Sequence, residues 1–185
     1  MYFDIELDAH QLADLRQLVA PLIIEEQMVG SDFVDGHMVI GCRAGPSIDL
    51  HNAMHEISHF IEIDRARMTT TNWGLKMPWV ECSLIREGGY VEFTKDQHIQ
   101  REIRVWAIQT SLSNHRGLKV TPSDLASSAI YLPQDYMICS DPSQRIHRVT
   151  HLIEELLDKP EYGPEALLAE FHDRRISLMA NKTRA

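Results

Sequence analysis

The sequence predicts an α+β domain that is mainly helical and carries a small antiparallel sheet or hairpins. Apolar residues recur at helical spacing in several segments, and two short segments turn at Asp35-Gly36 and at Gly88-Gly89. No repeat or long linker divides the 185 residues, and a chain of this length forms one domain by default. We therefore expect a single domain over residues 1–185, with a helical C-terminal part from about 120 to 185.

The first half of the chain is expected to contain helices and hairpins. Leucine and valine side chains at helical spacing predict a helix over residues 9–29, in which Pro21 can produce a kink. Apolar residues on both sides of Asp35-Gly36 predict a hairpin over residues 33–40. The elements expected next are a helix from Pro46 to about Arg67, a loop over 69–80 and a hairpin over 83–93.

The second half is expected to be helical, because apolar periodicity continues there and prolines stand at helix starts and joints. The expected helices cover residues 95–115, 122–131, 142–158 and 164–180.

The net charge of the chain and its few cysteines indicate which partners it can bind and in which cellular compartment it is found. Eighteen basic residues against 27 acidic residues give a net charge of −9, which disfavours bulk binding to nucleic acid or to an anionic membrane. No apolar run approaches the roughly 20 residues of a membrane span, and the first eight residues are acidic where a signal peptide would be basic. Three scattered cysteines fit a reducing compartment. We expect a cytoplasmic protein without membrane association, and its oligomeric state stays open.

His55-Glu-Ile-Ser-His59 is an H-E-x-x-H motif within a predicted helix. Residues four apart lie one above the other on a helix, so His55 and His59 can bind one cation. Glu56 lies about 100° round the helix, where its carboxylate can take a proton from a metal-bound water. The alternative is a solvated polar face, since ten histidines make a chance match less rare. A face rich in histidine instead of lysine and glutamate favours the metal site.

A catalytic zinc site needs a third protein ligand and one open position. Glu102 lies at the apolar margin of the predicted helix over 95–115, where a carboxylate needs a partner such as a cation. The alternative for Glu102 is a salt bridge to Arg101 or Arg104. His51 is disfavoured, because three ligands in line on one helix span about 12 Å. The other rival ligands are Glu62, His98, Glu81, Glu87 and Glu92.

Further residues are candidates for orienting a ligand or for contacting substrate. Glu62 could orient a ligand histidine, and His51 and His98 share the same helix edges as the proposed ligands. An oxyanion-stabilising group should also lie near the metal, and the candidates for it are Tyr90, His98, Arg104 and His115.

The motif at residues 55–59, followed by Glu102-Ile-Arg-Val-Trp-Ala107, resembles the zincin metallopeptidases whose third ligand is a glutamate on a second helix. Within them it is most similar to the ImmA/IrrE-type group of small intracellular proteins. The resemblance covers residues 50–64 and 98–112. It implies a zincin-like domain in which His55, His59 and Glu102 bind zinc and Glu56 is the general base.

The sequence thus predicts a zinc-dependent metallopeptidase, a hydrolase that cleaves peptide bonds in a protein or peptide substrate by Glu56-assisted attack of metal-bound water. The alternative is a catalytically silent metal-binding protein on the same scaffold, with an interaction or regulatory role. Manganese, iron or cobalt could occupy the same set of nitrogen and oxygen donors.

Overall fold

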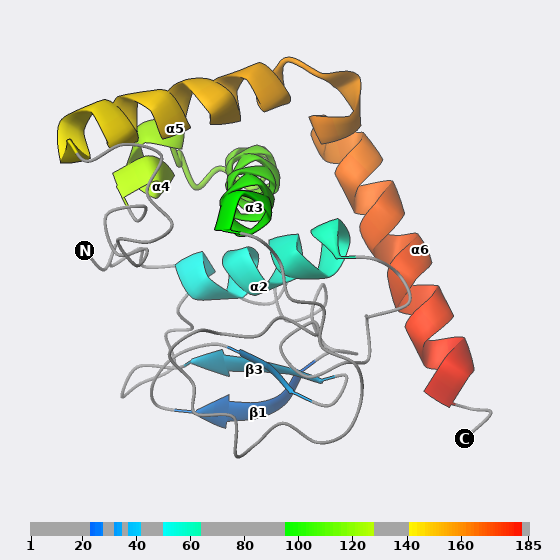
Figure 1. The fold of residues 1–185 in the computed structure, drawn as a ribbon. Helices are drawn as coiled ribbons and strands as arrows, with labels where there is room; N and C mark the ends of the chain where they lie inside the picture. Colours follow the sequence, from blue (N-terminus) through cyan, green and yellow to red (C-terminus); the bar gives the residue numbers. More distant parts are fainter. Residues whose placement is uncertain are drawn as a thin grey trace.

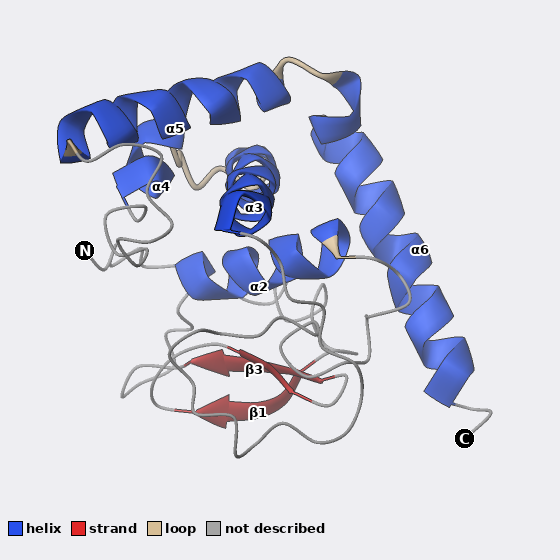
Figure 2. Cartoon of the chain, in the orientation of Figure 1, coloured by secondary structure: helices blue, strands red, loops and turns tan. Residues whose placement is uncertain are grey.

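The computed structural model of the chain describes residues 23–27, 32–34, 37–41, 50–63, 95–127 and 141–182. Within these ranges, helices form most of the structure (Figure 2). The helices are α2 (Leu50–Glu62), α3 (Lys95–His115), α4 (Pro122–Ala126), α5 (Pro142–Leu157), the 3₁₀ helix η6 (Pro160–Tyr162) and α6 (Pro164–Lys182).

Helix α3 lies at the centre of the described part, between α2 on one side and α5 on the other (Figure 1). Helix α4 packs between α3 and α5, and α6 follows η6 and then contacts both α2 and α3. The helix that carries the H-E-x-x-H motif is therefore packed against two other helices, α3 and, near its C-terminal end, α6.

Two of the helices begin at well-formed N-caps. Thr121 and Asp124 form a reciprocal capping box at the start of α4, in which each side chain accepts a hydrogen bond from the other residue's backbone N–H. Asp141 accepts hydrogen bonds from the backbone N–H groups of Ser143 and Gln144 at the start of α5, directly before a proline at the first helical position. These caps place both helix starts at the prolines that the sequence indicates.

The apolar core lies between α3, α4 and α5. Each residue of this core has 4% or less of its surface exposed to solvent. The core residues are Ile99, Ile103, Trp106, Ala107, Leu125, Ala126, Val149 and Ile153. A second contact joins α2 to α6, where the rings of Phe60 and Phe171 meet edge to face with centroids 5.8 Å apart. Both aromatic side chains are fully buried.

Three short strands form a sheet in the order β1-β3-β2, and β3 contacts α2 (Figure 1). Strand β1 is Ile23–Gln27, β2 is Asp32–Val34 and β3 is His37–Gly41. Strands β2 and β3 are antiparallel, with Val34 opposite His37, whereas β1 and β3 are parallel.

The prediction of an α+β domain with a small antiparallel sheet is wrong, because the described part of the chain is a mainly helical domain. Every side chain described as buried lies on helices α2 to α6 or at Ile63, next to the end of α2. The strands are at most five residues long, and one of the two pairings is parallel. The prediction placed the helices around a sheet, whereas in the structure the helices pack mainly against one another.

The predicted helix over residues 9–29 is also wrong at its C-terminal end, because residues 23–27 form strand β1. Pro21 precedes this strand, and a proline cannot sit in a helix interior without removing a hydrogen bond. The strand pairing at Asp32–Val34 and His37–Gly41 confirms the predicted hairpin. The predicted loop over 69–80 and the predicted hairpin over 83–93 lie outside the described residues, as does the chain before residue 23.

The later helices agree with the predictions to within a few residues. Helix α3 matches the predicted range 95–115, and α5 and α6 differ from their predicted ranges by one and two residues at the end. Two predicted helices are too long: α2 begins and ends inside its predicted range, and α4 begins at Pro122 as predicted but ends at Ala126, five residues before the predicted end. None of the helices in the described ranges combines the length and the apolar character that crossing a membrane requires.

Candidate metal centre

Helix α2 places the two histidines of the motif one turn apart on the side that faces α3. Their Nε2 atoms lie 3.1 Å apart, and the ring centroids are separated by 4.6 Å with the ring planes nearly perpendicular, at 86°. The helical spacing of four residues thus brings the two imidazoles together, as the motif predicts. Met54 and Ile57 of the same helix are buried.

Glu102 reaches the two histidines from α3. Its Oε2 lies 3.8 Å from Nε2 of His55, and its Oε1 lies 3.6 Å from Nε2 of His59. The side chains of His59 and Glu102 are about one-tenth exposed, while that of His55 is 26% exposed. Within the described ranges, His55, His59 and Glu102 are the one group of three or more metal-ligand side chains whose donor atoms all lie within 4.8 Å.

The donor set fits a tetrahedral divalent ion. Two donors about 2.0–2.1 Å from zinc at the tetrahedral angle lie about 3.3 Å apart. The nitrogen pair, at 3.1 Å, is slightly closer than this. The nitrogen–oxygen distances are slightly wider, and each histidine is nearest to a different oxygen of Glu102, at 3.6 Å to Oε1 and 3.8 Å to Oε2. Two imidazoles and one carboxylate leave one position of a tetrahedron to another ligand, which is the pattern of catalytic sites. The three residues could therefore hold a metal ion.

Gln109 on α3 holds the other nitrogen of His55. Its Oε1 lies 3.1 Å from Nδ1 of the imidazole, and the Gln109 side chain is fully buried. Burial lowers the pKa of His55, and the hydrogen bond to Gln109 opposes part of that shift. A histidine with a lowered pKa stays neutral in weakly acidic solution, and the neutral form is the one that binds metals.

Glu62, the last residue of α2, is engaged by two arginines of α3. Its Oε2 accepts from Nε and Nη2 of Arg101 at 2.9 and 2.6 Å, and its Oε1 accepts from Nε and Nη2 of Arg104 at 2.9 and 2.7 Å. Both oxygens of the carboxylate are thus used by guanidinium groups, which form strong paired hydrogen bonds with carboxylates. Glu62 lies outside the three-residue cluster and joins the C-terminal end of α2 to the middle of α3 instead.

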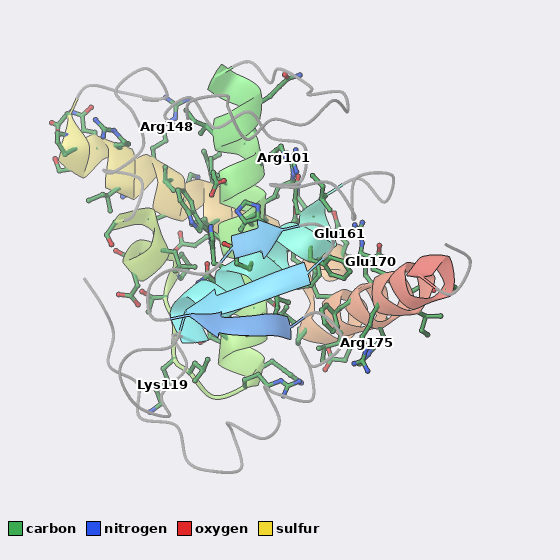
Figure 3. All side chains as sticks on the ribbon, turned by 90° about the horizontal axis from the view of Figure 1, so that it is seen from below. Arg101, Lys119, Arg148, Glu161, Glu170 and Arg175 are labelled. Atoms are coloured by element: carbon green, nitrogen blue, oxygen red, sulfur yellow. The ribbon has the colours of Figure 1, made fainter. Side chains whose placement is uncertain are left out.

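The ion pairs of Glu62 concern the alternative that the sequence offers for Glu102, a salt bridge to Arg101 or Arg104. Arg101 and Arg104 each direct two donors to Glu62, and the Glu102 carboxylate faces the two histidines. Arg101, labelled in Figure 3, projects from α3 one residue before Glu102. Consecutive residues on a helix point about 100° apart, so one turn of α3 can serve both partners on α2.

The C-terminal end of α2 is capped by a side chain from α6. Nη1 of Arg174 donates to the carbonyl oxygens of Phe60, at 3.1 Å, and of Ile63. Nε of the same guanidinium donates to Glu170 at 2.6 Å, and the side chain is one-tenth exposed. The last carbonyls of a helix have no partner within it, so Arg174 satisfies groups that α2 leaves open next to His59.

The remaining candidates are placed only in part. Glu56 is half-buried on α2, next to His55. His51 and His98 lie on α2 and α3, but their side chains are outside the described part, and Tyr90, Glu81, Glu87 and Glu92 lie outside the described residues. Sequence reasoning missed the contacts of Gln109 and Arg174. Gln109 follows Glu102 by seven residues, two helical turns, and this spacing is the signal that could have found it.

No protein-family model, no curated protein and no solved structure matches the chain. The site is thus defined by its own geometry as a possible metal-binding site of two histidines and one glutamate.

Proposed function

We propose that the protein is a zinc-dependent metallopeptidase that hydrolyses peptide bonds in a protein or peptide substrate. The observation that carries the proposal is the convergence of His55, His59 and Glu102, on two different helices, within 4.8 Å. The glutamate of the H-E-x-x-H motif is the second requirement, because hydrolysis needs a base beside the metal. A purely structural site needs no such base and usually has four protein ligands.

In the proposed reaction, three residues bind the metal ion and a fourth transfers protons. His55, His59 and Glu102 would hold the ion, which, when bound, supplies a Lewis acid that polarises the substrate carbonyl and makes water more acidic. Glu56 accepts a proton from the water whose oxygen bonds to the carbonyl carbon. It then returns that proton to the amine nitrogen as the carbon–nitrogen bond breaks.

The engagement of Glu62 supports an open coordination position. A carboxylate one turn after His59 is a plausible fourth ligand, and a fourth protein ligand would block substrate. Arg101 and Arg104 take up both oxygens of Glu62 at 2.6–2.9 Å. Among the residues that the structure describes, the ligand set therefore consists of three, which leaves a place for water and substrate beside the ion.

We propose a place for the protein among zincins with a glutamate third ligand, similar to the ImmA/IrrE-type group, and a location in the cytoplasm. Ser58 stands in the motif where that group often has glycine. Its side chain is fully buried and donates to the carbonyl oxygen of Met54 at 2.7 Å, so a serine is accommodated in α2 with its polar group satisfied. The three scattered cysteines support the reducing compartment.

The experiment compares the parent protein with Glu56→Gln, both loaded with zinc, on denatured casein and on a pool of synthetic peptides. We expect cleavage by the parent, a loss of kcat of about 10²-fold or more in Glu56→Gln, and equal zinc content in both. Glu154→Gln, a change at an exposed glutamate of α5, is the matched control and should cleave as the parent does. Equal cleavage by Glu56→Gln, or zinc-loaded parent that cleaves nothing, contradicts the proposal. The second result favours a silent metal-binding protein.

A further inference from the structure

Gln109 is fully buried, and its side chain contacts Nδ1 of His55, the ring nitrogen that does not face the other proposed ligands. Its Oε1 lies 3.1 Å from Nδ1 of His55, and it stands on α3 two turns after Glu102. An amide oxygen can only accept a hydrogen bond. The hydrogen in this contact must therefore be on Nδ1 of the imidazole.

The position of that hydrogen determines which nitrogen can bind a metal. A neutral imidazole carries one hydrogen, so a ring with the hydrogen on Nδ1 has a free electron pair on Nε2. Nε2 is the atom of His55 that lies 3.1 Å from Nε2 of His59 and 3.8 Å from Glu102. The contact with Gln109 thus selects the tautomer in which the atom nearest to the cluster is the one able to donate electrons.

We infer that Gln109 is a positioning residue of the metal centre, which fixes His55 in the Nδ1–H tautomer before any ion binds. The inference rests on the proposed metal site, and it adds how that site is prepared. Helix α3 then has two functions, because Glu102 supplies a ligand and Gln109 orients a ligand of the opposite helix. Hydrogen-bond partners of this kind commonly contribute 10- to 100-fold to metal affinity.

The first test is nitrogen-15 NMR of the histidine rings in the metal-free protein, which distinguishes the two neutral tautomers. We expect His55 of the parent to carry its hydrogen on Nδ1, and Gln109→Leu, which keeps the volume but has no acceptor, to lose this preference. Thr110→Val is the matched control, since the Thr110 hydroxyl is buried on α3 and bonds to the Trp106 carbonyl oxygen at 2.8 Å. Its His55 should remain in the parent tautomer.

The second test is zinc affinity, measured by competition with a chelator. We expect a 10- to 100-fold loss in Gln109→Leu, recovery of most of that loss in Gln109→Glu, whose carboxylate also accepts from Nδ1–H, and no change in Thr110→Val. Gln109→Met, of similar length, replaces the leucine variant if that variant does not fold.

Two results overturn the inference even if the parent binds zinc. One is a parent protein in which His55 carries its hydrogen on Nε2, and the other is a folded Gln109→Leu variant that binds zinc as tightly as the parent. Neither experiment measures peptide cleavage. A parent protein that binds zinc but cleaves no peptide therefore contradicts the proposed function and leaves the inference about Gln109 standing. If the parent binds no zinc, the metal centre fails, and the role of Gln109 in it is overturned as well, whatever the tautomer of His55.

Discussion

Glu62 of α2 accepts two hydrogen bonds from Arg101 of α3, at 2.9 and 2.6 Å, next to the residue that supplies the third donor of the cluster. Both side chains are less than one-tenth exposed. The pair joins the end of the helix that carries the histidines to the turn of the helix that carries Glu102. Because the three donors come from two helices, their distances depend on how these helices are held together.

Replacing Glu62 should therefore weaken the protein. Glu62→Leu leaves the Arg101 guanidinium buried without this carboxylate, and removal of one partner of a buried ion pair costs about 3 kcal/mol or more of unfolding free energy. Arg104→Met is the control, because its side chain is 39% exposed and an exposed ion pair contributes about 1 kcal/mol or less. Urea denaturation of the three proteins measures the difference. Equal losses in both variants would show that the Glu62–Arg101 pair has no special role.

Removing a proposed ligand should abolish tight zinc binding without unfolding the chain. In His55→Ala and in Glu102→Ala we expect zinc affinity to fall by about 100-fold or more, because a three-ligand site reduced to two residues loses one bond to the ion. His151→Ala is the matched control, since this histidine is exposed on α5 and pairs with Glu155. Titration calorimetry on the three variants and the parent tests this, and parent-like affinity in both ligand variants contradicts the assignment.

The stability of the metal-free protein should depend on pH through His55. Burial holds the pKa of His55 below its ordinary value of about 6.5, so the folded state binds fewer protons than the unfolded state in this range. The contribution of His55 is fully present above pH of about 6.5 and is lost as the pH falls through the lowered value. Urea denaturation with a chelator at several pH values between 7 and 5 should give a shallower slope for His55→Gln than for the parent. Identical slopes contradict the expectation.

The cap at the end of α2 gives a prediction about α6. Arg174→Met removes the donors to the carbonyls of Phe60 and Ile63, and hydrogen bonds to a charged group contribute about 1.5–3 kcal/mol each, so we expect a loss of about 3 kcal/mol. Arg175→Met changes the neighbouring arginine, which is half-buried on the same helix (Figure 3), and should cost about 0.5 kcal/mol or less. Thermal unfolding monitored by circular dichroism compares the two. Similar losses in both variants would contradict the role of Arg174.

The helices could be predicted because their signals are local. Proline at the start of α5 and periodic apolar residues along it are visible within sixteen residues. The sheet could be predicted only in part. The hairpin signal at Asp35-Gly36 is local, but the parallel pairing of Ile23 with Met38 joins segments fifteen residues apart, and short apolar runs fit a helix or a strand equally well. For this reason residues 23–27 were predicted as helix.

The same distinction applies to the site. His55 and His59 are four residues apart, so their meeting follows from helix geometry alone. Glu102 could be predicted from its place at an apolar margin of α3. The contacts of Gln109 with His55 and of Arg174 with Phe60 join residues 54 and 114 positions apart. Gln109 could be suspected only through its spacing of two helical turns from Glu102. No spacing connects Arg174 to the site.

Anomalous X-ray scattering at the zinc edge, from crystals of the parent protein grown with zinc, tests the metal centre most directly. We expect one strong peak about 2.0–2.2 Å from Nε2 of His55, Nε2 of His59 and a carboxylate oxygen of Glu102, with a further position open. A peak at other residues, or no peak while the three side chains remain 3.1–3.8 Å apart, would contradict the assignment.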